Sequence, residues 1–235
     1  MFALEYHCAT CRPKHVGRFY KSPDAQDLSR YQEAEARLSK LKPRFIPSEE
    51  IPAGDETDRL HRWGYHRYRE MFNSRQLLGL ELSCAFISGV ADLKVRRALA
   101  TNLSDLLRYQ NMLCRYDTMA LKSLDIFSVH GFPIGQIQCE SNLLGIPGTG
   151  KLTSVGSGGW FNISEKFAKA KTYCERPFEI RHAGSRKEQV FIDGEWIGEL
   201  RNGKLLPERR AVTLSCADAS ETKLKKASFD AVLTD

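Results

Sequence analysis

The chain has 235 residues and a mass of 26.7 kDa, with 42% hydrophobic and 27% charged residues. This composition excludes a collagen-like fibre and a disordered tail, and the length suffices for one large domain or two small ones. The 35 Lys and Arg residues exceed the 29 Asp and Glu residues and give a net charge of +6, which permits an anionic partner without requiring one.

Targeting and redox signals are few. The sequence has no run of eighteen apolar residues, and residues 1–7 lack the charged and apolar regions of a signal peptide. We therefore expect a soluble, cytoplasmic protein with no membrane partner. The seven cysteines are odd in number, and those after Cys11 are far apart in apolar segments, which favours reduced thiols over a disulfide framework.

The first predicted region, residues 1–56, combines a strand, a helix and a connector. Residues 2–6 alternate as a strand does. Residues 22–24 (Ser-Pro-Asp) are an N-cap, a first-turn proline and an early acid, and they predict a charged helix that ends near Lys42. Prolines and a glycine in residues 47–55 predict an extended connector.

The second region, residues 57–125, is predicted to be the main helical core. Its apolar spacing predicts three helices, with residues 73–74 (Asn-Ser) at the start of the second. The predicted apolar faces are Leu77, Leu78, Leu82 and Phe86 on the second helix, and Leu99, Leu103, Leu106 and Leu107 on the third. Arginines and aromatic residues alternate in residues 59–69, and such a mixture can stack on bases and pair with phosphates. The alternative is an amphipathic helix with its aromatic residues inward.

The third region, residues 126–210, is predicted to hold a glycine-rich loop, a short helix and a β insertion. Glycines and turn formers extend from Gly131 to Gly159, and a helical pattern follows over residues 163–174. Asp193-Gly194 and Asn202-Gly203 separate short alternating runs. Because such dipeptides are the strongest local signal for hairpins, we expect a small antiparallel meander.

The fourth region, residues 211–235, contains two more predicted strands, residues 211–216 and 229–233. Each is followed by an acid, Asp218 and Asp235. In an open α/β sheet, acids at the carboxyl ends of neighbouring strands converge on one crevice. The alternative is that both acids are caps or turn residues.

Two local motifs give further candidate sites. Residues 145–151 have the glycine and lysine spacing of a phosphate-binding loop, but Leu152 stands where a magnesium-holding hydroxyl is required. A surface loop is the favoured interpretation, and a nucleotide hydrolase that uses Lys151 is a third function hypothesis. Cys8 and Cys11 have the spacing of half a zinc site, which needs four ligands, so zinc binding stays an open alternative.

Several segments resemble a known enzyme family. Residues 212–219 and 229–235 look like the strand pair that leads into the Asp-Pro-Pro-Tyr motif of DNA amino-methyltransferases. The longer segments resemble the large adenine-specific DNA methylases described as containing a Zn-ribbon, and they are residues 55–65, 72–80, 138–148, 156–160, 165–166 and 170–179. The resemblance covers nearly the whole chain.

The resemblance implies a fold, a reaction and two site residues. The fold would be mixed α and β: a helical middle, a small antiparallel meander and the stub of a Rossmann-like methyltransferase sheet. Such enzymes transfer a methyl group from S-adenosylmethionine to the exocyclic amine of a flipped base, usually adenine N6. Asp235 matches the catalytic carboxylate that orients the amine, and Asp218 matches the acid that contacts the adenosyl part of the cofactor.

The chain also departs from the family pattern. Pro-Pro-Tyr does not follow Asp235, and residues 156–159 are not the glycine-rich cofactor motif. We therefore expect a methyltransferase fragment that alone neither binds S-adenosylmethionine tightly nor methylates DNA. Residues 1–210 would be a DNA-facing insertion, and the partners would be DNA and the remainder of the enzyme. The alternative is a non-catalytic nucleic-acid-binding module.

Overall fold

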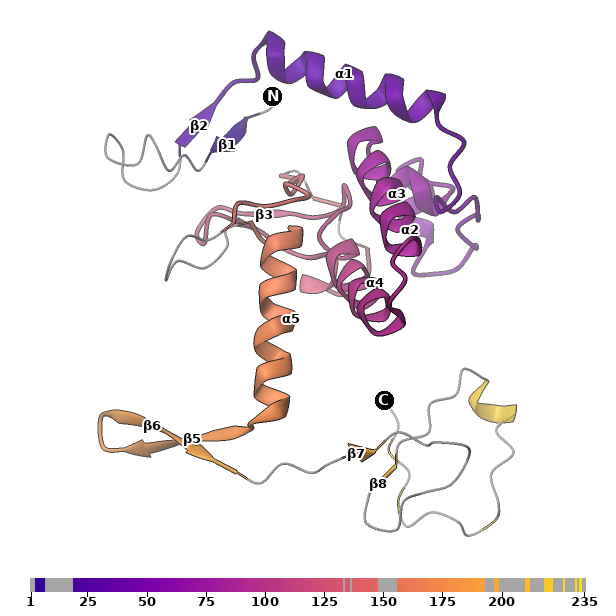
Figure 1. The fold of residues 1–235 in the computed structure, drawn as a ribbon. Coiled ribbons are helices and arrows are strands. Elements are labelled where there is room, and N and C mark those ends of the chain that lie inside the picture. The colour runs from indigo at the N-terminus through magenta and orange to yellow at the C-terminus, as the bar shows by residue number, and fades with distance from the viewer. Residues whose placement is uncertain are drawn as a thin grey trace. The chain divides into compact units, whose positions relative to one another are not determined.

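Figure 1 shows the fold in a computed structural model. The structure describes residues 3–6, 19–132, 134–135, 137–147, 156–192, 197–198, 210–211, 218–221, 226, 231 and 233. The predictions for Cys8, Cys11, Lys151 and Asp235 lie outside the described residues. The chain divides into two compact units, Met1–Lys171 and Thr172–Asp235, and each is described by itself.

The described elements are helices and short strand pairs, so the predicted mixed α and β class is confirmed at this level. The α-helices are α1 (Ala25–Lys40), α2 (Asp58–Arg62), α3 (Ser74–Ser88), α4 (Leu93–Leu107) and α5 (Trp160–Glu175), and the 3-10 helices are η1 (Tyr68–Met71), η2 (Ile126–Ser128) and η3 (Ala219–Glu221). The strands pair as β1 (Leu4–Tyr6) with β2 (Phe19–Lys21), β3 (Tyr116–Asp117) with β4 (Lys122–Ser123), β5 (Phe178–Ala183) with β6 (Arg186–Phe191), and β7 (Ile197–Gly198) with β8 (Arg210–Ala211). None of the helices in the described ranges is long and apolar enough to cross a membrane.

The predicted first helix forms, but its cap is Asp24 and not Ser22. The Asp24 carboxylate accepts hydrogen bonds from the backbone N–H groups of Gln26 and Asp27, both at 3.0 Å. In return, the Asp24 N–H donates to the Asp27 carboxylate at 3.1 Å. This is a capping box, which satisfies backbone donors that the helix itself leaves free. Helix α1 ends at Lys40, two residues before the predicted end.

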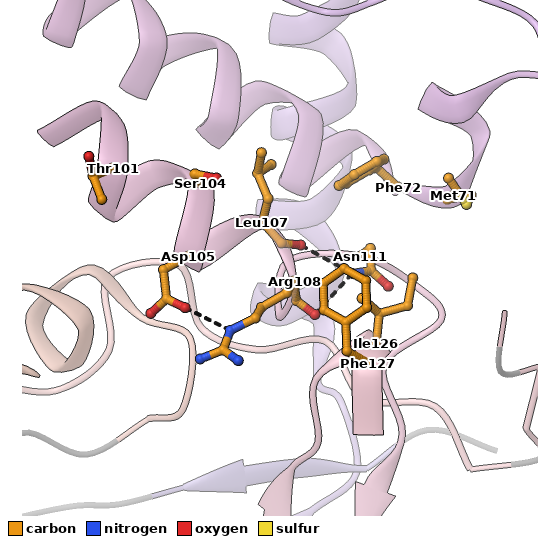
Figure 2. Close-up of a pocket in the computed structure, with 10 residues that line it drawn as sticks. All are labelled: Met71, Phe72, Thr101, Ser104, Asp105, Leu107, Arg108, Asn111, Ile126 and Phe127. Atoms are coloured by element: carbon orange, nitrogen blue, oxygen red, sulfur yellow. Dashed lines mark hydrogen bonds and ion pairs between the residues drawn. The ribbon is translucent and has the colours of Figure 1, made fainter. Parts of the chain in front are cut away.

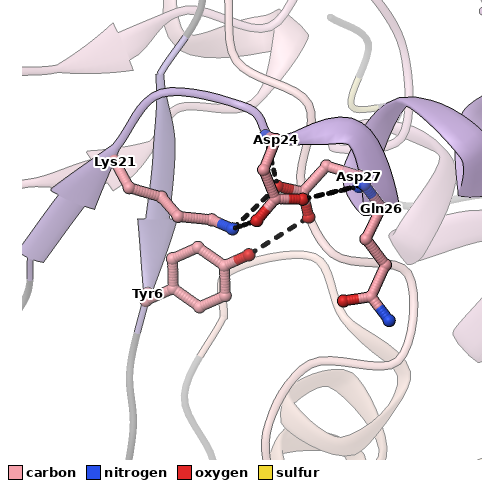
Figure 3. Close-up of polar contacts among 5 residues, drawn as sticks. All are labelled: Tyr6, Lys21, Asp24, Gln26 and Asp27. Atoms are coloured by element: carbon pink, nitrogen blue, oxygen red, sulfur yellow. Dashed lines mark hydrogen bonds and ion pairs between the residues drawn. The ribbon is translucent and has the colours of Figure 1, made fainter.

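A polar cluster connects the strand pair β1–β2 to the start of α1 (Figure 3). Lys21 on β2 bonds Asp24 at 2.6 Å and Asp27 at 2.8 Å, and the Tyr6 hydroxyl donates to Asp27 at 3.3 Å. The ammonium group lowers the pKa of Asp24 to about 2, and the two carboxylates raise the pKa of Lys21. The β1–β2 pair is therefore fixed to the helix by charge as well as by the chain.

The first of the three predicted helices in residues 57–125 is shorter than the sequence pattern suggests. Helix α2 ends because Gly64 adopts φ +86°. The Gly64 N–H donates a hydrogen bond to the His61 carbonyl at 2.9 Å, and the Tyr65 N–H donates one to the Leu60 carbonyl at 3.0 Å. Both bonds are those of a Schellman motif, which terminates a helix at a left-handed glycine. The single amphipathic helix considered for residues 59–69 is therefore wrong.

Helices α3 and α4 are confirmed, with Asn73 as the predicted cap of α3, but the predicted face of α3 is only partly right. Leu78 is buried as predicted, whereas Leu82 and Phe86 are 39% and 76% exposed and Leu80 and Glu81 are buried instead. The buried Glu81 carboxylate accepts the backbone N–H groups of residues 44 and 45 at 2.8 and 2.9 Å. The core of the unit has two buried clusters, Ile51, Leu60, Met71 and Leu113 in one and Leu80, Leu106 and Ile163 in the other.

In the second unit, the β insertion differs from the predicted meander. Strand β6 includes residues 189–191, which precede the predicted Asp193-Gly194 turn, but its antiparallel partner is the upstream strand β5, and the turn between them is Gly184-Ser185. Strands β7 and β8 pair in parallel, a pairing that the sequence patterns did not predict. The Asp193-Gly194 and Asn202-Gly203 turns and most of the two strands predicted after residue 211 lie outside the described residues.

Candidate nucleic-acid interface

The predicted cofactor residue Asp218 lies exposed at the start of η3. Its Oδ1 accepts hydrogen bonds from the N–H and the hydroxyl of Ser220, at 2.8 and 2.7 Å, and these bonds lower the pKa of the carboxyl. The residue therefore acts locally as a turn former with one oxygen engaged. Because Asp235 is outside the described residues, the convergence of the two acids on one crevice stays a prediction.

The start of the predicted phosphate loop is built as a turn. Residues 140–144 form no strand, and Gly145 adopts φ +74°. The Asn142 side chain accepts the N–H groups of Leu144 and Gly145, both at 3.0 Å. This is an Asx-type turn.

Helix α5 begins after this segment, and two donors at its start are already used. The N–H groups of Trp160 and Phe161 donate to the carbonyls of Leu143 and Leu144 at 2.9 and 3.0 Å. A phosphate-binding helix needs such donors free to point at the anion. The geometry of these described residues therefore does not favour the nucleotide hydrolase hypothesis.

Two of the segments that carry the family resemblance meet at Glu140. Arg75 on α3 donates to both Glu140 oxygens at 2.7 Å, and the Asn73 amide donates to Glu140 at 2.8 Å. The Arg75 guanidinium lies 5.3 Å from the centre of the Tyr31 ring on α1. The Glu140 carboxylate accepts three hydrogen bonds, and these hold the start of α3 against the loop.

The other glycine-rich segment packs against the end of α4. The Gln110 side chain, fully buried, donates to the Gly158 carbonyl at 3.0 Å. A Cβ on Gly158 would lie 2.0 Å from Cβ of Tyr109, and one on Gly159 would lie 2.7 Å from the backbone nitrogen of Gly145. Residues 156–159 are glycine-rich because the backbone is crowded there, and this explains them without a cofactor.

The first unit has a hollow of about 650 Å³. Figure 2 shows the residues that line it. Its lining includes the apolar residues Met71, Phe72, Leu107, Ile126 and Phe127. The charged groups at its edge are engaged: Asp105 pairs with Arg108 at 2.7 Å, and Arg108 also reaches Asp125 at 3.5 Å. The Asn111 amide donates to two backbone carbonyls at 3.1 and 3.2 Å. This arrangement offers apolar surface and supplies no unengaged general base among these groups.

The arginine-rich and aromatic segment is not an open stacking platform. Tyr65 and Tyr68 pack against the buried cluster of Ile51 and its neighbours, and the rings of His61 and His66 stack on each other at 5.6 Å. Trp63 is 66% exposed and is the aromatic residue of this segment that most resembles a base-stacking side chain.

Sequence reasoning missed the hairpin β5–β6, whose strands are exposed over nearly their whole length. Residues 179–183 and 186–191 are all exposed, and Phe178 at the base is half-buried. The base is fixed by aromatic packing: the Phe178 ring lies 5.3 Å from Tyr173 of α5 and 6.3 Å from Phe191. The signal was present, since Gly184-Ser185 is a hairpin dipeptide, and Gly184 adopts φ +63°.

The register assigns the hairpin side chains to two faces. Opposite residues of an antiparallel pair lie on one face, and successive residues alternate. Face A consists of Phe178, Ile180, His182, Lys187, Gln189 and Phe191; face B consists of Glu179, Arg181, Ala183, Arg186, Glu188 and Val190.

Charge concentrates at the tip of this hairpin. Arg181 pairs with Glu188 across face B at 2.9 Å. Among the described residues, Arg186 and Lys187 enter no ion pair, and both are exposed beside the turn. Unpaired cations at the end of an exposed ribbon are suited to phosphate contacts.

The metal question concerns the cysteines. Within the described ranges no three His, Cys, Asp or Glu side chains gather as a metal-binding group, and Cys8 and Cys11 fall outside those ranges. Zinc binding by Cys8 and Cys11 therefore stays a prediction. The cysteines that the structure describes, Cys84, Cys114, Cys139 and Cys174, are free thiols.

Comparison of the chain with protein-family models, with curated proteins and with solved structures finds no match. The assignment of a function therefore depends on the residues and the geometry described above.

Proposed function

We propose that this chain is the DNA-contacting part of an S-adenosylmethionine-dependent, adenine-specific DNA methyltransferase. The observation that carries the DNA-contacting role is the exposed β5–β6 hairpin with Arg186 and Lys187 unpaired beside its turn. The enzyme class comes from the resemblance of the sequence segments, and the hairpin supplies a physical means of binding the duplex.

The dimensions of the hairpin fit a DNA groove. Two paired strands lie about 4.8 Å apart, and the five residue steps from the Phe178–Phe191 pair to the Ala183–Arg186 pair span about 17 Å. The major groove is about 12 Å wide and about 8.5 Å deep, and it admits a two-stranded ribbon. The hairpin is therefore narrow enough to lie lengthwise in the major groove with one face toward the groove floor.

Stability also favours a partner for the hairpin. A two-stranded hairpin that buries neither face is marginally stable in water. Here the base has the aromatic contacts of Phe178 and Phe191 and the Arg176 guanidinium 3.8 Å from the centre of the Phe191 ring. The outer half has the Arg181–Glu188 pair at the surface, and such a pair contributes little. Binding to a polyanion would order this outer half.

The methyl donor would require residues beyond those that the hairpin provides. S-adenosylmethionine would supply the methyl group. Asp218 has one carboxylate oxygen engaged by Ser220, which leaves Oδ2 to accept a hydroxyl of the adenosyl ribose. We expect the purified chain to show no tight binding of S-adenosylmethionine by calorimetry.

The test of the DNA-contacting role is binding of the full chain to a labelled duplex, measured by fluorescence anisotropy over a range of salt concentrations. The variant Arg186→Gln with Lys187→Gln removes two positive charges from the DNA-contacting surface, so the slope of log K against log salt should fall by about 0.9 for each charge that neutralises a phosphate. The matched control, Lys94→Gln with Arg97→Gln, removes the same charge from exposed positions on α4 and should leave the slope nearly unchanged. Equal slopes in all three proteins would refute the role of the hairpin.

The second candidate is a nucleic-acid-binding module without catalysis. The exposure of Asp218 and the engagement of its Oδ1 by Ser220 favour it. A methyl-transfer assay with labelled donor and duplex separates the two functions when the chain is supplied together with the remainder of a methyltransferase. Transfer that depends on Asp218 would support the enzyme, and DNA binding with no transfer would support the module.

A further inference from the structure

We infer that face A of the β5–β6 hairpin reads base pairs in the major groove of duplex DNA, with Gln189 and Lys187 as the residues that determine the sequence. This inference rests on the proposed function, because it requires that the hairpin bind DNA. It adds which face enters the groove, which side chains touch base edges and which bases they select.

Charge decides which face turns toward the bases. Face B carries two carboxylates, Glu179 and Glu188, whereas the outer part of face A carries Lys187, His182 and Gln189 and no acid. The floor of the major groove presents mainly hydrogen-bond acceptors, N7 and O6 of guanine, N7 of adenine and O4 of thymine. Carboxylates would be repelled there, and donors are attracted. Face A is the face that fits.

The side chains on face A are free to make these contacts. Gln189 and Lys187 are exposed, and within the described part of the chain neither side chain is engaged in a hydrogen bond or ion pair. On face B, by contrast, Arg181 is already bonded to Glu188 at 2.9 Å. Face A therefore binds a ligand without first breaking an internal contact.

The spacing along the strand matches the spacing of bases. Gln189 and Lys187 are two residues apart on β6, which corresponds to about 6.8 Å. Base pairs rise by about 3.4 Å along one strand, so the two side chains would meet base pairs two steps apart. Their cross-strand neighbours, Ile180 and His182, flank the same two positions.

Each side chain selects a different base. A glutamine amide donates and accepts, and it pairs in a bidentate manner with N6 and N7 of adenine. A lysine ammonium only donates, and it matches O6 and N7 of guanine. Ile180, which is 45% exposed opposite Gln189, offers apolar contact to the methyl group of the thymine paired with that adenine. The expected target is an A·T pair and a G·C pair two steps apart.

The test is selection of bound duplexes from a random library by the full chain, followed by sequencing. The wild-type chain should enrich adenine and guanine two steps apart. Gln189→Ala should lower the adenine preference about tenfold, while the guanine preference and the salt dependence of binding stay as in the wild type. The matched control is Glu179→Ala. It truncates a face B side chain opposite Val190, the residue next to Gln189 in β6, and it should keep the adenine and the guanine preference.

The outcomes separate this inference from the proposed function. Duplex binding that depends on Arg186 and Lys187 but shows no base preference would overturn base reading by face A and leave the DNA-contacting role intact. Loss of the preference in Glu179→Ala but not in Gln189→Ala would assign reading to face B and overturn the inference. No duplex binding by the wild-type chain would overturn both.

Discussion

The packing of Gly158 against Tyr109 gives a prediction whose size can be worked out from the structure. In Gly158→Ala the new Cβ would lie 2.0 Å from Cβ and 2.4 Å from Cγ of Tyr109. Non-bonded carbon atoms in contact are separated by about 3.5–4.0 Å, so one of the two backbones must move by roughly 1 Å or more. That movement would stretch the buried hydrogen bond from Gln110 to the Gly158 carbonyl.

Two costs add in this variant. Gly158 adopts φ +76°, and a left-handed backbone costs an alanine about 1–2 kcal/mol. Overpacking costs a further amount of about 1–3 kcal/mol, so we expect a loss of about 2–5 kcal/mol in the free energy of unfolding. The control is Gly64→Ala, since Gly64 adopts φ +86° and has no atom within 4 Å of its would-be Cβ. Only the backbone cost of about 1–2 kcal/mol applies there.

The assay is urea unfolding of the full chain followed by far-ultraviolet circular dichroism, with the midpoint and slope fitted for each variant. A second variant sharpens the test. Adding Tyr109→Ala to Gly158→Ala keeps a Cβ at position 109, so the clash remains and stability should not recover. Equal losses in Gly158→Ala and Gly64→Ala, or recovery in the double variant, would refute the packing argument.

Three further predictions follow from contacts described above. Asn73→Ala removes both the α3 cap and a hydrogen bond to Glu140, so it should lower the free energy of unfolding in urea by about 2–3 kcal/mol. Asn73→Ser keeps a capping oxygen and should recover part of this loss. Equal stability of the two variants would count against the cap. Lys21 lowers the pKa of Asp24 from 3.8 to about 2, so the stabilisation that Asp24 provides is present above about pH 4 and is lost as the pH falls toward 2. Salt screens this ion pair. The acid unfolding midpoint of Asp24→Asn should therefore shift less with added salt than that of the wild type. Burial raises the pKa of the Cys114 thiol to about 11, so iodoacetamide at pH 8 should label exposed Cys174 and leave Cys114 unlabelled in the native chain, as peptide mass spectrometry would show; equal labelling would contradict the burial.

Local signals in the sequence predicted local structure well. Asn73 caps α3 as its residue type and position indicated, and the connector over residues 47–55 contains no helix and no named strand. These features depend on hydrogen bonds between residues a few positions apart, so the sequence window contains their cause. The exposed hairpin also had a local signal in Gly184-Ser185, which was missed because the Asp-Gly and Asn-Gly turns downstream looked stronger.

Features that depend on distant partners could not be predicted. The buried face of α3 includes Glu81, whose carboxylate accepts backbone donors of Arg44 and Phe45, 37 and 36 residues earlier. Glu140 meets Arg75 across a separation of 65 residues. A periodicity of apolar residues is equally satisfied by neighbouring rotations of a helix, and a long-range polar contact decides between them.

The close approach of Gly159 to Gly145 has a practical consequence for engineering the chain. The two backbones are held together by this contact and by the bonds from Trp160 and Phe161 to the carbonyls of Leu143 and Leu144. The ends of the intervening stretch are therefore pinned by groups outside it. Lengthening a loop between fixed ends costs only about 0.6 kcal/mol for each doubling of its length. A short peptide insert between Gly145 and Gly159 should therefore cost little stability and leave the contact between these two glycines unchanged.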